Sequence, residues 1–454
     1  MDLESVLSKR CPGFLKPLLC RVQSSPVGYR IARGMFWSLA GAAISRGIML
    51  AAWILVARVL GRVAYGELGM VQSTVGLFGV FAGFGLGITA TKHVAQYRAS
   101  NPQRAGWIIG LSEVFAIGSG TLISLVLLIF APWIAAHTIN APHLTGCLRV
   151  GSLVLFFSAL NGAQIGSLSG LEAFRTLAFV NLIVGFLSFP ILLAGAYFGG
   201  LTGAVWALVV TLCVNSLANH LALRKEANEL DIPITIKSCL REGSILWKFS
   251  VPAFLAGAMV GPVNWLCRAL LVNRPSGYEE MGLLNAADQW QTMMLFVPTL
   301  LSAVILPVLS ERLSRGDLAG SKQTIRGAIK INLCLVVPVS ILASIVSPYI
   351  MGFYGNGFRE GWPTLVMVLL ATVFMAVIMP ANQVLAALGK MWIGLILNVV
   401  WAIVIILGTI SFLDLGSLGL ASARAGGYAL HSILVFVCVL YFLNKAERKG
   451  PQTI

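Results

Sequence analysis

Charged residues are scarce in this chain. Asp, Glu, Lys and Arg together make up only 11% of its 454 residues, whereas a typical soluble domain has roughly 25%. Hydrophobic residues make up 57% of the chain, and the mean hydropathy is +0.86. This composition excludes a soluble globular protein and predicts an integral membrane protein.

Motifs that would indicate several other classes of protein are also missing. The eight cysteines are scattered singly with no Cys-x-x-Cys, which argues against a metal site or a disulfide framework. The chain has no GxxxxGK(S/T) phosphate-binding loop, so ATP is not the expected energy source. Pro12, Pro17 and Pro26 interrupt the first 33 residues, which therefore do not read as a secretory signal.

Apolar runs of membrane-spanning length, by contrast, recur from residue 34 to residue 443. At about 20 residues for each membrane-spanning helix, they predict an all-α integral membrane protein with twelve transmembrane helices. The 47 glycines suit the close packing of helices in lipid. The twelve helices are expected near residues 34–57, 66–90, 107–130, 147–169, 176–198, 201–222, 248–272, 284–308, 328–350, 363–388, 391–412 and 418–443.

The distribution of basic residues predicts the orientation of the chain. With the N-terminus in the cytoplasm, 24 of the 32 Lys and Arg residues fall on the cytoplasmic side and four on the outer side. This ratio follows the positive-inside rule and puts both termini in the cytoplasm. The net charge of +15 is therefore a topology signal rather than a sign of nucleic-acid binding, and anionic membrane lipids are expected partners.

The two halves of the chain resemble each other. At an offset of 213 residues, Tyr65 and Gly69 match Tyr278 and Gly282. Other matches occur in the same order in each half and pair Phe36 with Phe249, Gln164 with Gln383, Gly170 with Gly389, Asn181 with Asn398 and Gly203 with Gly419. Because a repeat of six helices keeps its orientation, the halves are related by an axis along the membrane normal. Transporters that rock one bundle against the other around a central site have this arrangement.

The repeat predicts the domain organisation. We expect a cytoplasmic segment 1–33, a six-helix lobe 34–222, a cytoplasmic linker 223–247, a second six-helix lobe 248–443 and a cytoplasmic tail 444–454. The first segment is either a short basic helix on the membrane surface or a disordered tail. The two lobes are expected to lie around a central cavity.

A resemblance to a known family rests on four stretches, ARVLGRVAYGELGMVQS, FGLGITATKHVAQYRA, SLSGLEAFRTLAFVN and GLTGAVWAL. They are similar to the polysaccharide-transporter branch of the multidrug/oligosaccharidyl-lipid/polysaccharide flippase superfamily. The resemblance runs from about Gly34 to Leu443. It implies a multi-pass protein of the bacterial plasma membrane, with two six-helix lobes around a central, often cationic, cavity.

The resemblance also implies a function. Such a transporter flips an undecaprenyl-diphosphate-linked oligosaccharide, an O-antigen or exopolysaccharide repeat unit, from the cytoplasmic to the outer leaflet by alternating access. The chain would then be no enzyme and would have no catalytic residues and no cofactor. Coupling to protons or another ion is left open, and other polysaccharide assembly proteins are further expected partners.

Arg46 is the first candidate for the substrate site. It lies about twelve residues, or roughly 18 Å, from either end of the first predicted helix. A fixed charge at this depth costs about 2.5–3.5 kcal/mol on insertion scales, so such an arginine is usually paired or oriented into a cavity. No acid stands within one helical turn of it. We expect Arg46 to bind an anionic group in the cavity, and a buried structural pair is the alternative.

Five further charged residues within the predicted helices are candidates for a site, coupling or structural role. Arg268 and Asp288 lie near the outer ends of neighbouring helices, where they form a structural pair unless Arg268 belongs to the substrate site. Arg149 either extends to the interface or contacts the substrate, and Arg424 is open between a cavity role and a structural one. Glu113 and Asp288 are acids with a coupling or structural role.

These charges do not cancel. Four arginines against two acids leave an excess of two positive charges within the predicted helices. A dianionic diphosphate would match that excess, and guanidinium groups suit phosphate oxygens.

Two other functions remain as alternatives. A cation-coupled multidrug antiporter of the same superfamily would favour buried carboxylates, of which the spans offer only Glu113 and Asp288. A membrane glycan ligase or polymerase would need a large outer loop with catalytic residues. The longest outer loop has about 16 residues, and its His137 and His143 have no acid nearby in sequence.

Overall fold

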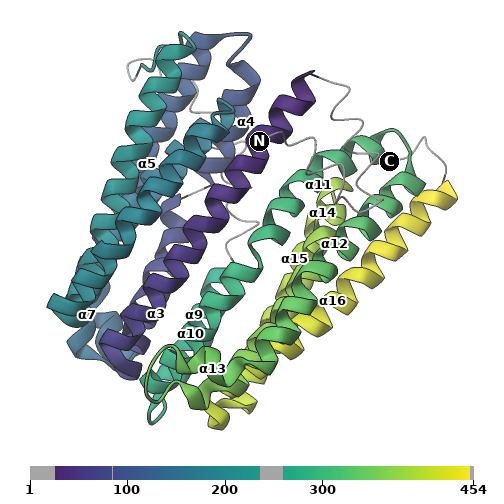
Figure 1. Cartoon of the computed structure of the whole chain (residues 1–454). Coiled ribbons are helices and arrows are strands. Elements are labelled where there is room, and N and C mark those ends of the chain that lie inside the picture. Colours follow the sequence, from purple (N-terminus) through teal and green to yellow (C-terminus); the bar gives the residue numbers. More distant parts are fainter. Residues whose placement is uncertain (1–25, 84, 236–258, 450–454) are drawn as a thin grey trace.

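The computed structural model describes residues 26–83, 85–235 and 259–449 (Figure 1). Within these ranges the regular structure is helical, with no strands. The fold is therefore all-α, as the apolar runs predict.

The first bundle consists of the helices up to residue 229. They are α3 (Pro26–Gly83), α4 (Leu86–Tyr97), α5 (Pro102–Trp133) with the π-helical turn Ile134–Thr138, the 3-10 turn Pro142–Leu144, α6 (Thr145–Gly170) and α7 (Phe174–Glu229).

Two glycines reverse the chain inside this bundle. Gly61 (φ 76°, ψ 173°) interrupts α3, and Gly200 (φ 55°, ψ −138°) interrupts α7. A positive φ with an extended ψ is essentially restricted to glycine, which has no Cβ to clash with its neighbouring peptides. Each of these long helical segments therefore contains two membrane passes joined by a tight turn.

The second bundle consists of the helices from residue 260 onward. They are α9 (Val260–Val272), α10 (Gly277–Met294), α11 (Phe296–Ser314), α12 (Leu318–Ile345), α13 (Ser347–Gly352), the 3-10 turn Arg359–Gly361, α14 (Trp362–Ala387), α15 (Met391–Ser411), the 3-10 turn Leu413–Leu415 and α16 (Gly416–Lys449). Figure 1 shows this bundle beside the first.

The helices make twelve passes. Eight helical segments of the described chain are long and apolar enough to cross a membrane, and the two that Gly61 and Gly200 interrupt count twice. The other two passes are the apolar α9 and the α10–α11 pair. The first part of α10 has too low a hydropathy to stand out as a membrane span, because it carries Glu279, Glu280 and Asp288. The predicted number of transmembrane helices is confirmed.

The exact domain boundaries stay a prediction, because residues 1–25, 236–258 and 450–454 lie outside the described residues. Two described helices continue past the predicted ends of the lobes. Helix α7 continues to Glu229, inside the predicted linker 223–247, and α16 continues to Lys449, inside the predicted tail. The polar residues that mark the linker in the sequence thus begin on an exposed helix end rather than in a loop.

Matching backbone turns support the internal repeat. Gly416 (φ 60°, ψ −134°), between α15 and α16, has nearly the same backbone conformation as Gly200 in the first bundle. At the end of α6, the amide N–H of Glu172 donates to Ser169 at 3.0 Å, and at the end of α14 that of Gly389 donates to Ala386 at 3.0 Å.

Two sequence pairings, Gly170 with Gly389 and Gln164 with Gln383, are therefore two residues out of register. Both Glu172 and Gly389 have a positive φ and end their helices in the same way, so Gly389 corresponds to Glu172 and not to Gly170. This register also pairs Asn181 with Asn398 without the gap that the sequence comparison required. The alignment of Gly170 with Gly389 was misleading although both are glycines. The feature that the two helix ends share is a residue with positive φ, and this residue need not be a glycine.

The hydrophobic cores show how the bundles are joined. The largest cluster of buried side chains contains residues of both bundles, such as Leu68 and Leu284. Away from the turn at Gly61 the cores separate: one smaller cluster, around Ile108 and Leu223, belongs to the first bundle, and another, around Leu309 and Val384, to the second. The bundles thus share a core at the Gly61 end and have separate cores at the opposite end.

Candidate functional site

The bundles touch most closely where α3 crosses α10. A Cβ atom on Gly66 would collide with the carbonyl oxygen of Tyr278, and one on Gly282 would collide with the carbonyl oxygen of Arg62. Glycine on both helices therefore allows backbone-to-backbone contact between the bundles. We call this contact, with the side chains around it, the closed end.

Aromatic and charged side chains complete the closed end. Tyr65 lies with its ring centroid 6.4 Å from that of Tyr354 and 6.0 Å from that of Phe358, and all three side chains are fully buried. Arg62 of the first bundle donates to Glu280 of the second at 2.9 Å and lies 3.4 Å from Glu360. Its Nε also donates to the carbonyl oxygen of Glu279 at 3.2 Å.

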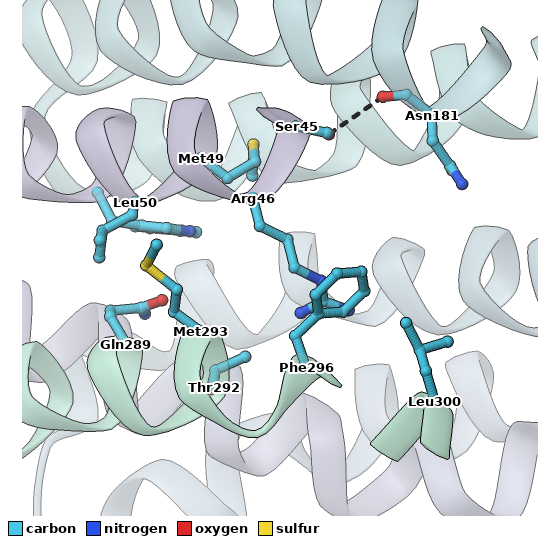
Figure 2. A pocket seen from close by; sticks show the side chains of 11 residues that line it. Ser45, Arg46, Met49, Leu50, Asn181, Gln289, Thr292, Met293, Phe296 and Leu300 are labelled. Carbon is cyan, nitrogen blue, oxygen red and sulfur yellow. Dashed lines mark hydrogen bonds between the residues drawn. The ribbon is translucent and has the colours of Figure 1, made fainter. Parts of the chain in front are cut away.

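A cavity of about 510 Å³ lies between the bundles, away from the closed end (Figure 2). It is bounded by α3 and α7 on one side and by α10 and α11 on the other. Its lining mixes polar, aromatic and apolar side chains: Ser45, Arg46, Met49, Leu50, Trp53, Asn181, Gln289, Thr292, Met293, Phe296 and Leu300.

Arg46 is the one charged group among these lining residues of the described chain. Figure 2 shows its side chain reaching from α3 toward α11, where the guanidinium carbon lies 4.4 Å from the ring centroid of Phe296. No ion pair links Arg46 to any residue that the structure describes. An arginine stacked on an aromatic face keeps its N–H groups available for an anion.

The wall beside Arg46 is fixed by a contact within the first bundle. The hydroxyl of Ser45 donates to the carbonyl oxygen of Asn181 at 3.1 Å. Gly185, one turn farther along α7, leaves the space that Ser45 occupies. This contact holds the Arg46 segment of α3 against α7, so the guanidinium projects from a supported helix.

Three of the other candidates form one cluster inside the second bundle. Asp288 accepts a hydrogen bond from Arg268 at 2.7 Å through one carboxylate oxygen and from Arg424 at 2.7 Å through the other. Arg424 also donates to Gln291 at 2.5 Å. Arg424 and Asp288 are buried, with exposed fractions of 6% and 8%. This cluster of Arg268, Asp288 and Arg424 (the Asp288 triad) is absent from the residues that line the cavity.

The last two candidates also lie away from the cavity. Arg149 is exposed on α6, and no ion pair connects it to the part of the chain that the structure describes. Glu113 on α5 is mostly buried, with its carboxylate 3.5 Å from Nδ1 of His220 on α7. Of the four candidate arginines, Arg46 alone is among the described residues that line the cavity.

The uncharged residues that make up most of the cavity lining were not predicted as site residues. Gln289 and Thr292 follow Asp288 on α10 at positions that face the first bundle, while Asp288 itself faces α9 and α16. Their polar character within a predicted span was a signal, but nothing in the sequence told which face of α10 meets the cavity. Trp53, Asn181 and Phe296 gave no signal distinct from that of other residues in the spans.

Comparison with known proteins identifies the family. The model of the family described as "Polysaccharide biosynthesis protein" matches residues 31–313, which is more than half of the chain. The chain belongs to this family.

Two curated relatives of this polysaccharide biosynthesis family member are named for transport. The EPS I polysaccharide export inner membrane protein EpsE of Ralstonia nicotianae is 24% identical over 287 residues, which cover 61% of this chain and 64% of EpsE. The lipid III flippase of Escherichia coli K12 is 25% identical over 295 residues, which cover 63% of this chain and 69% of the flippase. The match thus spans less than two thirds of EpsE. Both relatives are named as transport proteins rather than enzymes.

Solved structures share the fold. An inward-facing multidrug resistance MATE family transporter of the MOP superfamily superposes with a TM-score of 0.74 at 15% identity, and the match covers 90% of this chain and 99% of the transporter. The lipid II flippase MurJ in an inward closed conformation gives a TM-score of 0.67 at 16% identity, with 91% and 90% covered. At these identities the likeness establishes the transporter fold alone.

Proposed function

We propose that this family member flips an undecaprenyl-diphosphate-linked oligosaccharide from the cytoplasmic to the outer leaflet of the bacterial inner membrane. The observation that carries the proposal is Arg46, a cation that lines a cavity between two bundles and makes no ion pair with the described residues. The relatives named for polysaccharide export and lipid III flipping support the class of substrate. The particular glycan is left open.

Arg46 would bind the diphosphate. Its guanidinium can donate two parallel hydrogen bonds to phosphate oxygens, which gives orientation as well as charge neutralisation. Gln289, Thr292 and Asn181 offer hydrogen-bonding groups for the sugar next to the diphosphate, and Trp53 offers an apolar ring face. With the cytoplasm negative, outward movement of an anion is favoured by about 2.3 kcal/mol per charge per 100 mV.

The proposed orientation puts the closed end at the outer face. The positive-inside count assigns the turns at Gly61 and Gly200 to that face. The bundles, whose cores separate at the opposite end, then open toward the cytoplasm, where lipid-linked glycans would be loaded. Export requires the contact around Gly66 and Gly282 to part while the cytoplasmic end closes.

The cavity chemistry disfavours a drug antiporter. A pump for cationic drugs would present carboxylates to its substrate. Of the two intramembrane acids, Asp288 is bound by two arginines and Glu113 lies beside His220 in the first bundle. Neither is among the described residues of the cavity lining. Which ion, if any, is coupled to transport is left open.

Reconstitution tests the proposed function. We expect liposomes that contain the protein to expose an inner-leaflet polyprenyl-diphosphate oligosaccharide to an impermeant glycosidase added outside, whereas protein-free liposomes should protect it. A cationic dye such as ethidium should not be transported in the same liposomes. Dye transport without movement of the lipid-linked glycan would reject the flippase in favour of the antiporter.

A glycine substitution tests the closed end. We expect Gly66→Ala to weaken closure, because the added Cβ meets the carbonyl oxygen of Tyr278. In a cysteine-free background, a cavity cysteine introduced as Thr292→Cys should then react with an impermeant maleimide from the outside several times faster. Gly76→Ala is the matched control, since it lies on the same pass with no atom within 4 Å of the added Cβ. Equal labelling of both variants would show that this crossing does not keep the outer end closed.

A further inference from the structure

A second group of basic side chains lies at the start of α12. Lys322, Arg326 and Lys330 follow one another at intervals of four residues, so they lie on one helix face about 6 Å apart along the axis. Together with Ala319, Gln323 and Gly327 they line a hollow of about 390 Å³. The space beside Gly327 is open, since a Cβ there would meet no atom within 4 Å. We call Lys322, Arg326 and Lys330 the basic face of α12.

Two members of the basic face have no counter-charge in the part of the chain that the structure describes. The nearest acids in sequence are engaged elsewhere: Glu311 pairs with Arg315 at 2.7 Å, and Asp317 caps α12 through the N–H of Gly320 at 2.8 Å. No ion pair or hydrogen bond joins the side chain of Arg326 or Lys330 to a described residue. Like charges one turn apart repel each other, so an anion between them would be stabilising.

The basic face continues into an apolar surface. Cys334, Ile341 and Ile345 follow Lys330 at intervals that keep them on the same side of α12. Ile341 and Ile345 are exposed, with exposed fractions of 55% and 70%. The surface is therefore amphiphilic along its length, with cations at one end and apolar side chains at the other.

The length of α12 puts this change of character at the membrane interface. The helix has 28 residues and is therefore roughly 42 Å long, whereas the hydrocarbon core is about 30 Å thick. Its first turns must extend into the headgroup region, and the long side chains of Arg326 and Lys330 can reach the same level. The stretch from Cys334 toward Ile341 then lies at the depth of the lipid chains of the same leaflet.

We infer that Arg326 and Lys330 bind the phosphate group of a membrane lipid, whose hydrocarbon chain runs along α12 from Cys334 toward Ile341. The site is distinct from the Arg46 cavity, since no residue of α12 is among those that line the cavity. The phosphate belongs either to an anionic bilayer lipid or to a polyprenyl diphosphate. Both present a phosphate on an apolar chain, so the test must separate them.

Lipid binding to the full-length protein in detergent tests this site by native mass spectrometry. We expect phosphatidylglycerol to bind the wild type more tightly than phosphatidylcholine with the same chains. The double variant Arg326→Gln/Lys330→Gln should weaken phosphatidylglycerol binding about thirtyfold, the size expected for two cations near an anionic headgroup. The charge-preserving variant Arg326→Lys/Lys330→Arg should bind within about twofold of the wild type, since the cations remain.

The matched control removes the same charge elsewhere. Arg175→Gln/Arg224→Gln changes two exposed basic residues on the same predicted side of the first bundle, and it should leave binding within about twofold. Equal loss in both double variants, or equal binding of phosphatidylcholine by the wild type, would overturn the inference. Competition with undecaprenyl diphosphate then assigns the source. If undecaprenyl diphosphate displaces phosphatidylglycerol at a concentration much lower than that of phosphatidylglycerol itself, and does so from the wild type but not from the double variant, the site binds the polyprenyl carrier. If the two lipids compete at comparable concentrations, the site binds a bulk anionic lipid.

Discussion

We expect the Arg46→Ala variant to insert normally and to lose glycan export. Its guanidinium makes no ion pair with the described chain, so its removal strands no partner and should leave folding intact. Transport should suffer because no other residue of the described cavity lining carries a positive charge that could neutralise a diphosphate. A hydrogen bond to a charged group contributes about 1.5–3 kcal/mol, so losing it should lower the transport rate by about tenfold to a hundredfold. The readout is surface glycan in cells whose own flippase is deleted, normalised to the amount of membrane-inserted protein.

Two further variants sharpen this test. Arg46→Lys should retain part of the activity, because it keeps the charge but loses the paired N–H geometry. Arg149→Ala removes an exposed arginine outside the cavity and should export normally. Full export by a normally inserted Arg46→Ala protein would leave Arg46 as a structural residue and remove the main support for the proposed substrate site.

The number of helices could be predicted from the sequence because the cost of burying polar groups in lipid is large. Runs of apolar residues must span the membrane, and only short turns connect them. The weakest pass shows the limit of this reasoning. The α10 segment carries Glu279, Glu280 and Asp288, and two of these acids are satisfied by partners on other helices: Arg62 and Ser417 for Glu280, and Arg268 and Arg424 for Asp288.

The candidate site could be predicted only in part, for a related reason. Arg46 stood out because a mid-span arginine without a local acid needs an unusual environment, and the structure puts it in the cavity. Arg424 gave a similar signal, yet it is bound to Asp288 inside the second bundle. The sequence shows how deep in the membrane a charged residue lies. It does not show which neighbouring helix or cavity its side chain faces. Tertiary packing decides this.

Two of the positive charges in this count lie inside the protein at separate places, whereas Arg149 is exposed on α6 and Glu113 lies beside His220. The Asp288 triad carries one net positive charge within the second bundle, next to the closed end, and Arg46 carries another in the cavity. The diphosphate expected from the sequence would contact Arg46 directly. Its electrostatic interaction with the Asp288 triad would act only across α10. The two positive charges thus predict different phenotypes: loss of transport for Arg46 and loss of folding for the triad.

We expect Asp288→Ala to be the most destabilising single change in the second bundle. It leaves two guanidiniums without their carboxylate, and that of Arg424 is buried. Removal of one partner from a buried ion pair costs about 3–5 kcal/mol, a large share of the stability of a typical domain. Arg268→Ala should be milder, because Asp288 keeps its hydrogen bond to Arg424. The measurement is the amount of monodisperse protein in detergent, together with its thermal unfolding midpoint.

Second-site changes distinguish a structural triad from a transport role. Asp288→Ala combined with Arg424→Leu should regain part of the lost protein, since the buried cation is removed together with its partner. Asp288→Ala combined with Arg268→Ala should regain less, because Arg424 stays buried and unpaired. The shared carboxylate is the reason for this asymmetry: a simple Arg268–Asp288 pair would predict restoration by the second combination. If Asp288→Ala were instead abundant and stable but inactive, the triad would act in the transport cycle, and the buried hydrogen bonds of Arg424 would have to break during each turnover.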